Sequence, residues 1–131
     1  MAGGESARDA HLQFERIKTV ADLDRAVAAA SAGGKSVMLD FYADWCVYCK
    51  QMEKNTFPDP AVRQALANTV TLQADVTAND DEDKALLAHL GIPAPPAILF
   101  YDTNGEERRN FRLLGYMGPE EFADHISGAL R

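Results

Sequence analysis

The chain has no long apolar run and no excess of positive charge. No stretch approaches the roughly 18 apolar residues that a helix needs to cross a bilayer, so we expect no direct membrane insertion of this chain. Lysine and arginine together number 13, against 20 aspartates and glutamates, which gives a net charge of −7 and a pI near 4.8. This charge argues against binding to nucleic acid or to anionic membrane surfaces.

Cysteine is scarce as well, with only Cys46 and Cys49 among the 131 residues. A structural zinc site would need two further ligands, and His11, His89 and His125 are scattered without ligand spacing. We therefore predict no metal ion and no other cofactor.

The amino-terminal residues lack the apolar core of a signal peptide. Residues 1–10 are small and polar, so we expect a flexible linker or an artificial end there. Residues 11–131 are predicted to form one domain, because 47% hydrophobic and 25% charged residues are typical of a globular unit. Composition alone leaves the cellular compartment open.

The spacing of apolar residues predicts strands that alternate with helices. Strands are expected over residues 12–18, 37–42, 70–76, 97–101 and 110–114, the last two as a hairpin. Helix-start signals occur at Thr19, Cys46, Asp59, Asn79 and Gly118. The acidic run 80–83 fits a first helical turn better than a metal loop. This order predicts an α/β three-layer sandwich with a central mixed sheet.

The two cysteines stand between a predicted buried strand, 37–42, and a predicted helix. Unpaired N–H groups at a helix start favour the thiolate of Cys46, the species that attacks disulfides. Cys49, one turn later, can release the mixed disulfide that forms. A purely structural disulfide across so short a loop would stabilise the fold by only about 2 kcal/mol. Two inert buried thiols are a further alternative. We favour a redox-active dithiol.

Two acidic residues are placed to influence this dithiol. Asp40 is an ionisable group inside an apolar strand, six residues before Cys46, and we expect it to exchange protons with the cysteines. The alternative is a carboxylate that reaches water at the sheet edge. Glu53 falls on nearly the same helical stripe as both sulfurs, where its charge would restrain thiol reactivity. A solvated glutamate paired with a neighbouring lysine is equally compatible with this spacing.

Aromatic and proline residues define the expected partner-binding surface. Trp45 and Tyr48 flank Cys46 and suit contact with a partner's chain, although Trp45 could equally cover the core. Pro95 and Pro96 precede the strand 97–101. They form either a stiff loop or a cis-proline turn whose backbone pairs with a substrate strand.

Several segments together resemble the thioredoxin superfamily and, within it, the C-terminal domains of the bacterial thiol:disulfide interchange proteins DsbD. They are Met38-Leu-Asp-Phe-Tyr-Ala-Asp-Trp-Cys-Val47, Thr56-Phe57 followed by Asp59-Pro60, and Leu72-Gln-Ala-Asp-Val-Thr-Ala-Asn-Asp80. The similarity extends from about Phe14 to Ile126, and these segments are far more specific than a bare Cys-x-x-Cys pair.

The resemblance implies a thioredoxin-like fold and a periplasmic protein-disulfide reductase domain, expected to be monomeric. In that family the domain belongs to a membrane protein, accepts electrons from a transmembrane domain, and passes them to an N-terminal periplasmic domain that serves disulfide isomerases and cytochrome c maturation. Cys46 then corresponds to the attacking cysteine, Cys49 to the resolving one, and Asp40 and Glu53 to the family's two acidic positions.

Two positions depart from the family pattern. Tyr48 is bulkier than expected at its position, which puts partner fit in doubt. Alignment on the strand 97–101 makes Pro96 the cis-proline candidate, and the preceding Pro95 has no N–H to offer a substrate strand. We therefore predict that a substrate strand pairs with the Pro95 carbonyl only.

Overall fold

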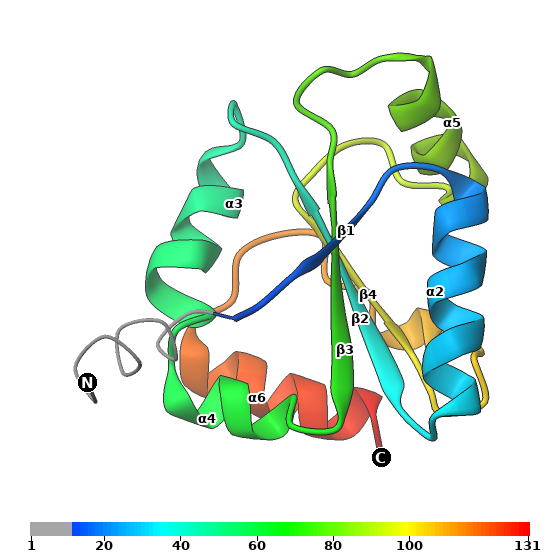
Figure 1. The fold of residues 1–131 in the computed structure, drawn as a ribbon. Coiled ribbons are helices and arrows are strands. Elements are labelled where there is room, and N and C mark those ends of the chain that lie inside the picture. The colour runs from blue at the N-terminus through cyan, green and yellow to red at the C-terminus, as the bar shows by residue number, and fades with distance from the viewer. Residues whose placement is uncertain (1–11) are drawn as a thin grey trace, which may run out of the picture.

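The computed structural model describes residues 12–131, so the linker predicted at 1–10 lies outside the described residues. Its centre is a four-stranded sheet in the order β1 (Glu15–Ile17), β3 (Thr69–Asp75), β2 (Ser36–Tyr42) and β4 (Ala97–Tyr101). The first three strands run parallel, and β4 pairs antiparallel with β2 (Figure 1). The predicted mixed sheet is confirmed.

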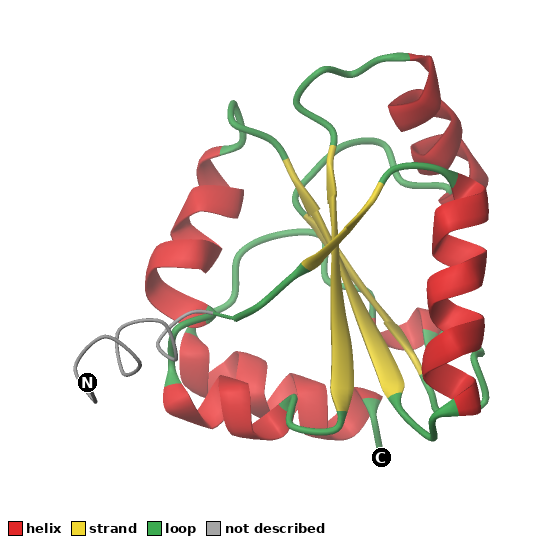
Figure 2. Ribbon diagram, viewed as in Figure 1, coloured by secondary structure: helices red, strands yellow, loops and turns green. Residues whose placement is uncertain are grey.

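Helical segments cover both faces of the sheet (Figures 1 and 2). One face carries α2 (Val20–Ala32) and α5 (Asp81–Leu90); the other carries α3 (Val47–Gln51), the π-helical turn η1 (Met52–Thr56), α4 (Pro60–Ala65) and α6 (Pro119–Ala129). A short 3₁₀ turn, η2 (Arg109–Phe111), follows β4. The three-layer α/β sandwich predicted from the sequence is therefore confirmed.

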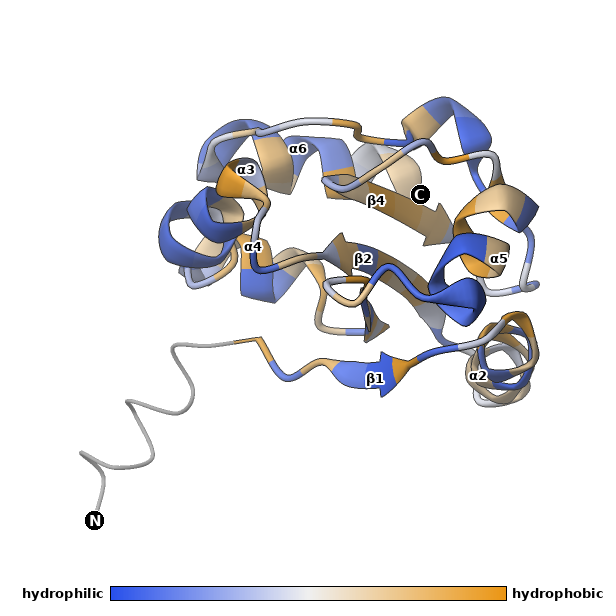
Figure 3. Ribbon diagram, turned by 90° about the horizontal axis from the view of Figure 1, so that it is seen from above, coloured by the Kyte–Doolittle hydropathy of each residue, from blue (hydrophilic) through white to orange (hydrophobic). Residues whose placement is uncertain are grey.

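Strand β2 divides the apolar core into two because successive side chains point to opposite faces. Val37, Leu39 and Phe41 join the cluster beneath α2 and α5, whereas Met38 joins the cluster beneath α4 and α6. All seven residues of β2 are buried, which places this strand at the centre of the molecule (Figure 3). Asp40 alternates onto the same face as Met38.

Helix capping explains most of the element boundaries. Thr19 accepts the N–H of Asp22, whose carboxylate accepts the N–H of Thr19, so the predicted start of α2 is confirmed. The predicted cap of α5 was one residue too early, because Asp80, and not Asn79, forms the capping box with Asp83. Asn79 instead has a positive φ of 49°, a conformation that asparagine tolerates. The acidic run forms the predicted first turn of the helix.

The predicted return strand at 110–114 is wrong. Only isolated bridges join this region to β4, at Ile98–Leu113 and Tyr101–Glu107, and η2 lies between them. The chain turns there because the ring of Phe111 packs against His125 of α6. The backbone carbonyl oxygen of Phe111 also lies 2.7 Å from His125 Nε2. These contacts with α6 replace the ladder of a regular hairpin.

Candidate active site at the carboxyl end of β2

The dithiol lies where β2 ends and the helical layer begins. Cys46 is the N-cap residue of α3, and its Sγ accepts the backbone N–H of Cys49 at 3.2 Å. The two cysteines are joined by a disulfide, with their Cα atoms 5.3 Å apart. Cys49 Sγ lies 3.5 Å from the carbonyl oxygen of Phe41, the second-to-last residue of β2. The backbone of β2 therefore fixes the position of the sulfurs.

Exposed apolar side chains surround the buried sulfurs. Cys46 is 6% exposed and Cys49 is 3% exposed, whereas Trp45, Val47 and Tyr48 are each more than half exposed. We call these three residues the rim. The structure places Trp45 at the surface and not in the core, although its indole N–H still donates to the carbonyl of Thr77. A protein face that meets the sulfurs must first meet the rim.

A buried polar group lies beneath the dithiol helix. Asp40 of β2 pairs in register with Gln73 of β3, and Gln73 Nε2 donates to Asp40 Oδ2 at 2.9 Å. The same Nε2 lies 3.4 Å from Glu53 Oε2 of η1. The amide of Gln73 thus connects the two acidic residues that the sequence singled out.

The surroundings of Asp40 alter its protonation. Burial raises the pKa of Asp40 to about 7, the hydrogen bond from Gln73 opposes this rise, and the negative charge of Glu53 adds to it. Asp40 is only 4% exposed, so the alternative of a carboxylate that reaches water at the sheet edge is not what the structure shows. A carboxyl group with a pKa near neutrality can both take up and release protons under physiological conditions.

Glu53 connects this buried group to solvent. Its side chain is exposed and lines a surface cavity of about 380 Å³ together with Phe14, Lys50 and Phe57. No ion pair joins Glu53 to Lys50 or Lys54 among the described residues; Lys50 Nζ instead lies 3.2 Å from the Tyr42 hydroxyl. Glu53 therefore faces both Gln73 and the cavity.

The two prolines lie at the same edge of the sheet as the dithiol. Ala97, which begins β4, pairs with Phe41, which nearly ends β2, so the preceding Pro95 and Pro96 lie next to the loop that leads to Cys46. The Pro95–Pro96 peptide bond is cis, in agreement with the alignment on the strand 97–101. The structure therefore brings the two prolines and the two cysteines to the same end of the sheet.

Two residues of this site were missed in the sequence. Gln73 stands at a polar position of β3, on the face opposite Leu72 and Ala74, so the alternation predicts a solvent-facing side chain and only the tertiary structure shows that it is buried. Thr77, just after β3, accepts hydrogen bonds from the residues that precede Cys46, and only the tertiary structure reveals this. No group of three metal-ligating side chains occurs within residues 12–131.

Comparison with known proteins places this geometry in a family. Residues 23–129 match the thioredoxin-like domain family. The crystal structure of the oxidised Neisseria meningitidis DsbD C-terminal domain superposes with a TM-score of 0.75 at 34% identity, over 88% of this chain and 99% of that one. The chain belongs to the thioredoxin-like domain family.

Other relatives agree with the assignment. Escherichia coli (strain K12) thiol:disulfide interchange protein DsbD is 54% identical over 116 residues, which are 88% of this chain and 20% of that protein. The chain thus spans about a fifth of the length of the curated relatives it matches. A Thermus thermophilus thioredoxin superposes with a TM-score of 0.70 at 26% identity, over 89% of this chain and 87% of that one. The family's thioredoxin-like fold is the fold described above.

Proposed function

We propose that this domain is a thiol:disulfide oxidoreductase that relays electrons between protein partners through a reversible Cys46–Cys49 disulfide. The observation that carries the proposal is the disulfide itself, set at the carboxyl end of a central strand above a buried carboxyl group and inside an apolar rim. A structural disulfide needs neither the rim nor the carboxyl group.

The reaction moves two electrons through two exchange steps. In the reduced domain the Cys46 thiolate attacks a partner disulfide, forms a mixed disulfide and releases one partner thiolate. The Cys49 thiolate then attacks Cys46 Sγ, closes the Cys46–Cys49 disulfide and releases the second partner thiolate. The two protons that leave the cysteines end on the partner thiols. Recharging reverses both steps with a dithiol donor.

The two acidic residues regulate when the cysteines ionise. Asp40 lies beneath the dithiol helix with a pKa near 7, so it can accept a proton as Cys49 becomes a thiolate and return it later. A negative charge on Asp40 or Glu53 disfavours a second negative charge on the Cys46 sulfur and restrains exchange until a partner is docked. Val47 and Tyr48 add no cation that would stabilise the thiolate, which favours a reductant over a strong oxidant.

The partners and the compartment are proposed from the similarity to DsbD. Similarity to DsbD supports a periplasmic, monomeric domain that accepts electrons from a transmembrane domain of its parent protein and donates them to an N-terminal domain of that parent. No helix within residues 12–131 has the length and apolarity needed to cross a bilayer. The relay would meet its partners through the exposed rim, which includes Trp45 and Tyr48, because these side chains flank the buried sulfurs.

Trapping experiments test the assignment of the two cysteines. Cys49→Ser is expected to accumulate a mixed disulfide through Cys46 with the oxidised N-terminal domain of Escherichia coli DsbD, seen as a reducible band on non-reducing gels. Cys46→Ser and the double variant are the matched controls and should trap little. A complex formed only by Cys46→Ser would reverse the two roles. A wild-type disulfide that resists dithiothreitol would instead identify a binding module with a structural disulfide.

The reduction potential decides the direction of electron flow. When the reduced domain is equilibrated with the oxidised N-terminal domain of Escherichia coli DsbD, that partner should end reduced, because electrons move toward the couple of higher potential. If the partner stays oxidised while this domain is reduced, the proposed direction is wrong.

A further inference from the structure

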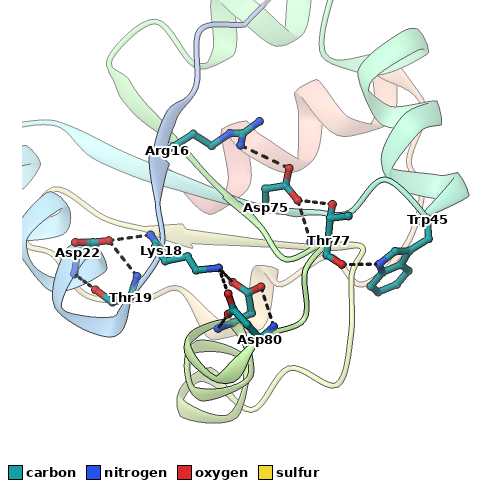
Figure 4. Close-up of polar contacts among 9 residues, drawn as sticks. Arg16, Lys18, Thr19, Asp22, Trp45, Asp75, Thr77 and Asp80 are labelled. Atoms are coloured by element: carbon teal, nitrogen blue, oxygen red, sulfur yellow. Dashed lines mark hydrogen bonds and ion pairs between the residues drawn. The ribbon is translucent and has the colours of Figure 1, made fainter.

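Thr77 connects the end of β3 to the two residues that precede the attacking cysteine. Its carbonyl oxygen accepts the Nε1–H of Trp45 at 3.2 Å, which Figure 4 shows. Its hydroxyl accepts the backbone N–H of Asp44 at 2.9 Å. One residue therefore holds both the backbone and the indole of the Asp44–Trp45 segment.

Asp75 fixes the orientation of the Thr77 hydroxyl. Asp75 Oδ1 accepts both the N–H and the hydroxyl of Thr77, and Arg16 of β1 lies 3.5 Å from Asp75 Oδ2 (Figure 4). A hydroxyl has a single hydrogen, so once it is donated to Asp75 only lone pairs face Asp44. Burial tends to raise the pKa of Asp75, but the Thr77 hydrogen bonds and the charges of Arg16 and Lys18 together outweigh it and lower the pKa, so the acceptor stays charged.

The Trp45 ring has few other restraints. Its side chain is 56% exposed, and no other hydrogen bond or ring contact of Trp45 is found among the described residues. A rigid aromatic surface binds a protein chain better than a mobile one because less side-chain entropy is lost on binding. The hydrogen bond that orients the indole therefore comes from Thr77, just after β3, and not from the dithiol helix.

We propose that Thr77 is a positioning residue for partner binding: held by Asp75, it fixes the Asp44–Trp45 segment so that the indole forms a preset platform for the backbone of a disulfide-bearing protein partner. This inference rests on the proposed function. It assigns to the loop after β3 a role in partner affinity that is separate from the chemistry of the sulfurs.

Thr77→Val and Thr77→Ser form a matched pair. Valine has the shape of threonine but cannot accept the Asp44 N–H, whereas serine keeps the hydroxyl. Trp45 is the only tryptophan of the chain, so its fluorescence reports the platform directly. In the oxidised protein, Thr77→Val should lower the steady-state anisotropy of Trp45, and Thr77→Ser should restore it.

Kinetics with a protein partner supply the second measurement. For reduction of the oxidised N-terminal domain of Escherichia coli DsbD, Thr77→Val should raise the half-saturating partner concentration about fivefold or more, while the limiting rate changes less than twofold. The rate with a small aromatic disulfide, which does not span the rim, should also change less than twofold. Thr77→Ser should return the half-saturating concentration to that of the wild type.

Two further variants keep the test decisive. Thr71→Val removes a hydroxyl of β3 that donates to the Gln13 carbonyl at 2.6 Å, and it should alter neither anisotropy nor partner kinetics. If Thr77→Val does not fold, Asp75→Ala leaves Thr77 in place without its acceptor and should shift both measurements in the same direction.

The outcomes separate this inference from the proposed function. Unchanged anisotropy and half-saturation in Thr77→Val, with the wild type active on the partner, would overturn the positioning role alone. An equal loss with the partner and the small disulfide would also overturn it, because that pattern indicates damage to the dithiol. A wild-type domain that fails to react with the partner would overturn the proposed function.

Discussion

Replacing Asp40 by asparagine should stabilise the oxidised domain at alkaline pH and have little effect at acid pH. Asparagine keeps the shape of the side chain and an oxygen that can accept the hydrogen bond from Gln73, but it has no charge to bury. In the disulfide form neither cysteine has a titrating thiol, so the difference between the two proteins reports the carboxyl group.

The magnitude follows from the difference between the folded and unfolded pKa values. The folded pKa of Asp40 is about 7, against an ordinary value of 3.8. Below pH 3.8 the group is neutral in both states and costs nothing. Between 3.8 and 7 only the unfolded state releases its proton, so stability falls with rising pH by about 1.4 kcal/mol per unit, and the total reaches about 4 kcal/mol. Above pH 7 the difference is constant.

Urea unfolding of the oxidised wild type and Asp40→Asn from pH 4 to 8.5 measures this effect. The variant should gain on the wild type through the window from 4 to 7 and then remain about 4 kcal/mol more stable. Asp124→Asn, at an exposed carboxyl group of α6, is the control and should follow the wild-type curve. Parallel curves for wild type and Asp40→Asn at every pH would refute the reasoning that burial dominates this carboxyl group.

Further variants test the surroundings of Asp40 and the apolar cluster beneath α4 and α6. Gln73→Leu should raise the pKa of Asp40 further, because a donor to the carboxylate is lost. Glu53→Gln should lower the pKa of Asp40, because a nearby negative charge is lost. NMR titration of the Asp40 carboxyl carbon measures both shifts, and shifts of the same sign would contradict the arrangement. Phe122→Ala should cost about 3–5 kcal/mol in urea unfolding, because this fully buried ring packs between Phe57 and Phe100. Phe122→Leu, which leaves a smaller void, should cost clearly less.

Local chemistry explains why much of the site was predictable. A dithiol after an apolar strand, an acid inside that strand and prolines before another strand are signals within single segments, and each concerns a constraint that the segment carries wherever it folds. The same holds for Thr19 and Asp59, whose side chains cap the helices that they precede.

Contacts between distant segments explain what was missed. The return strand expected at 110–114 fails because Phe111 packs against α6, and the cap of α5 shifts to Asp80, which shares Lys18 with the buried Asp83. Spacing within a segment contains no information about a lysine 62 residues away along the chain. At 110–114 local propensity therefore lost to a tertiary contact, whereas the Asp80–Asp83 capping box of α5 is a local pattern that Lys18 reinforces.

The sequence by itself determined the sandwich of strands and helices, the redox dithiol as the favoured chemistry, and the family, because these depend on periodicity, capping and residues adjacent in the chain. Only the tertiary structure decided how these residues act on one another. It joined Asp40 to Glu53 through Gln73, exposed Trp45 instead of burying it, and placed Thr77 against the loop before Cys46. The physical reason is that burial, and hence the pKa of Asp40, arises only when β2, β3 and η1 pack together.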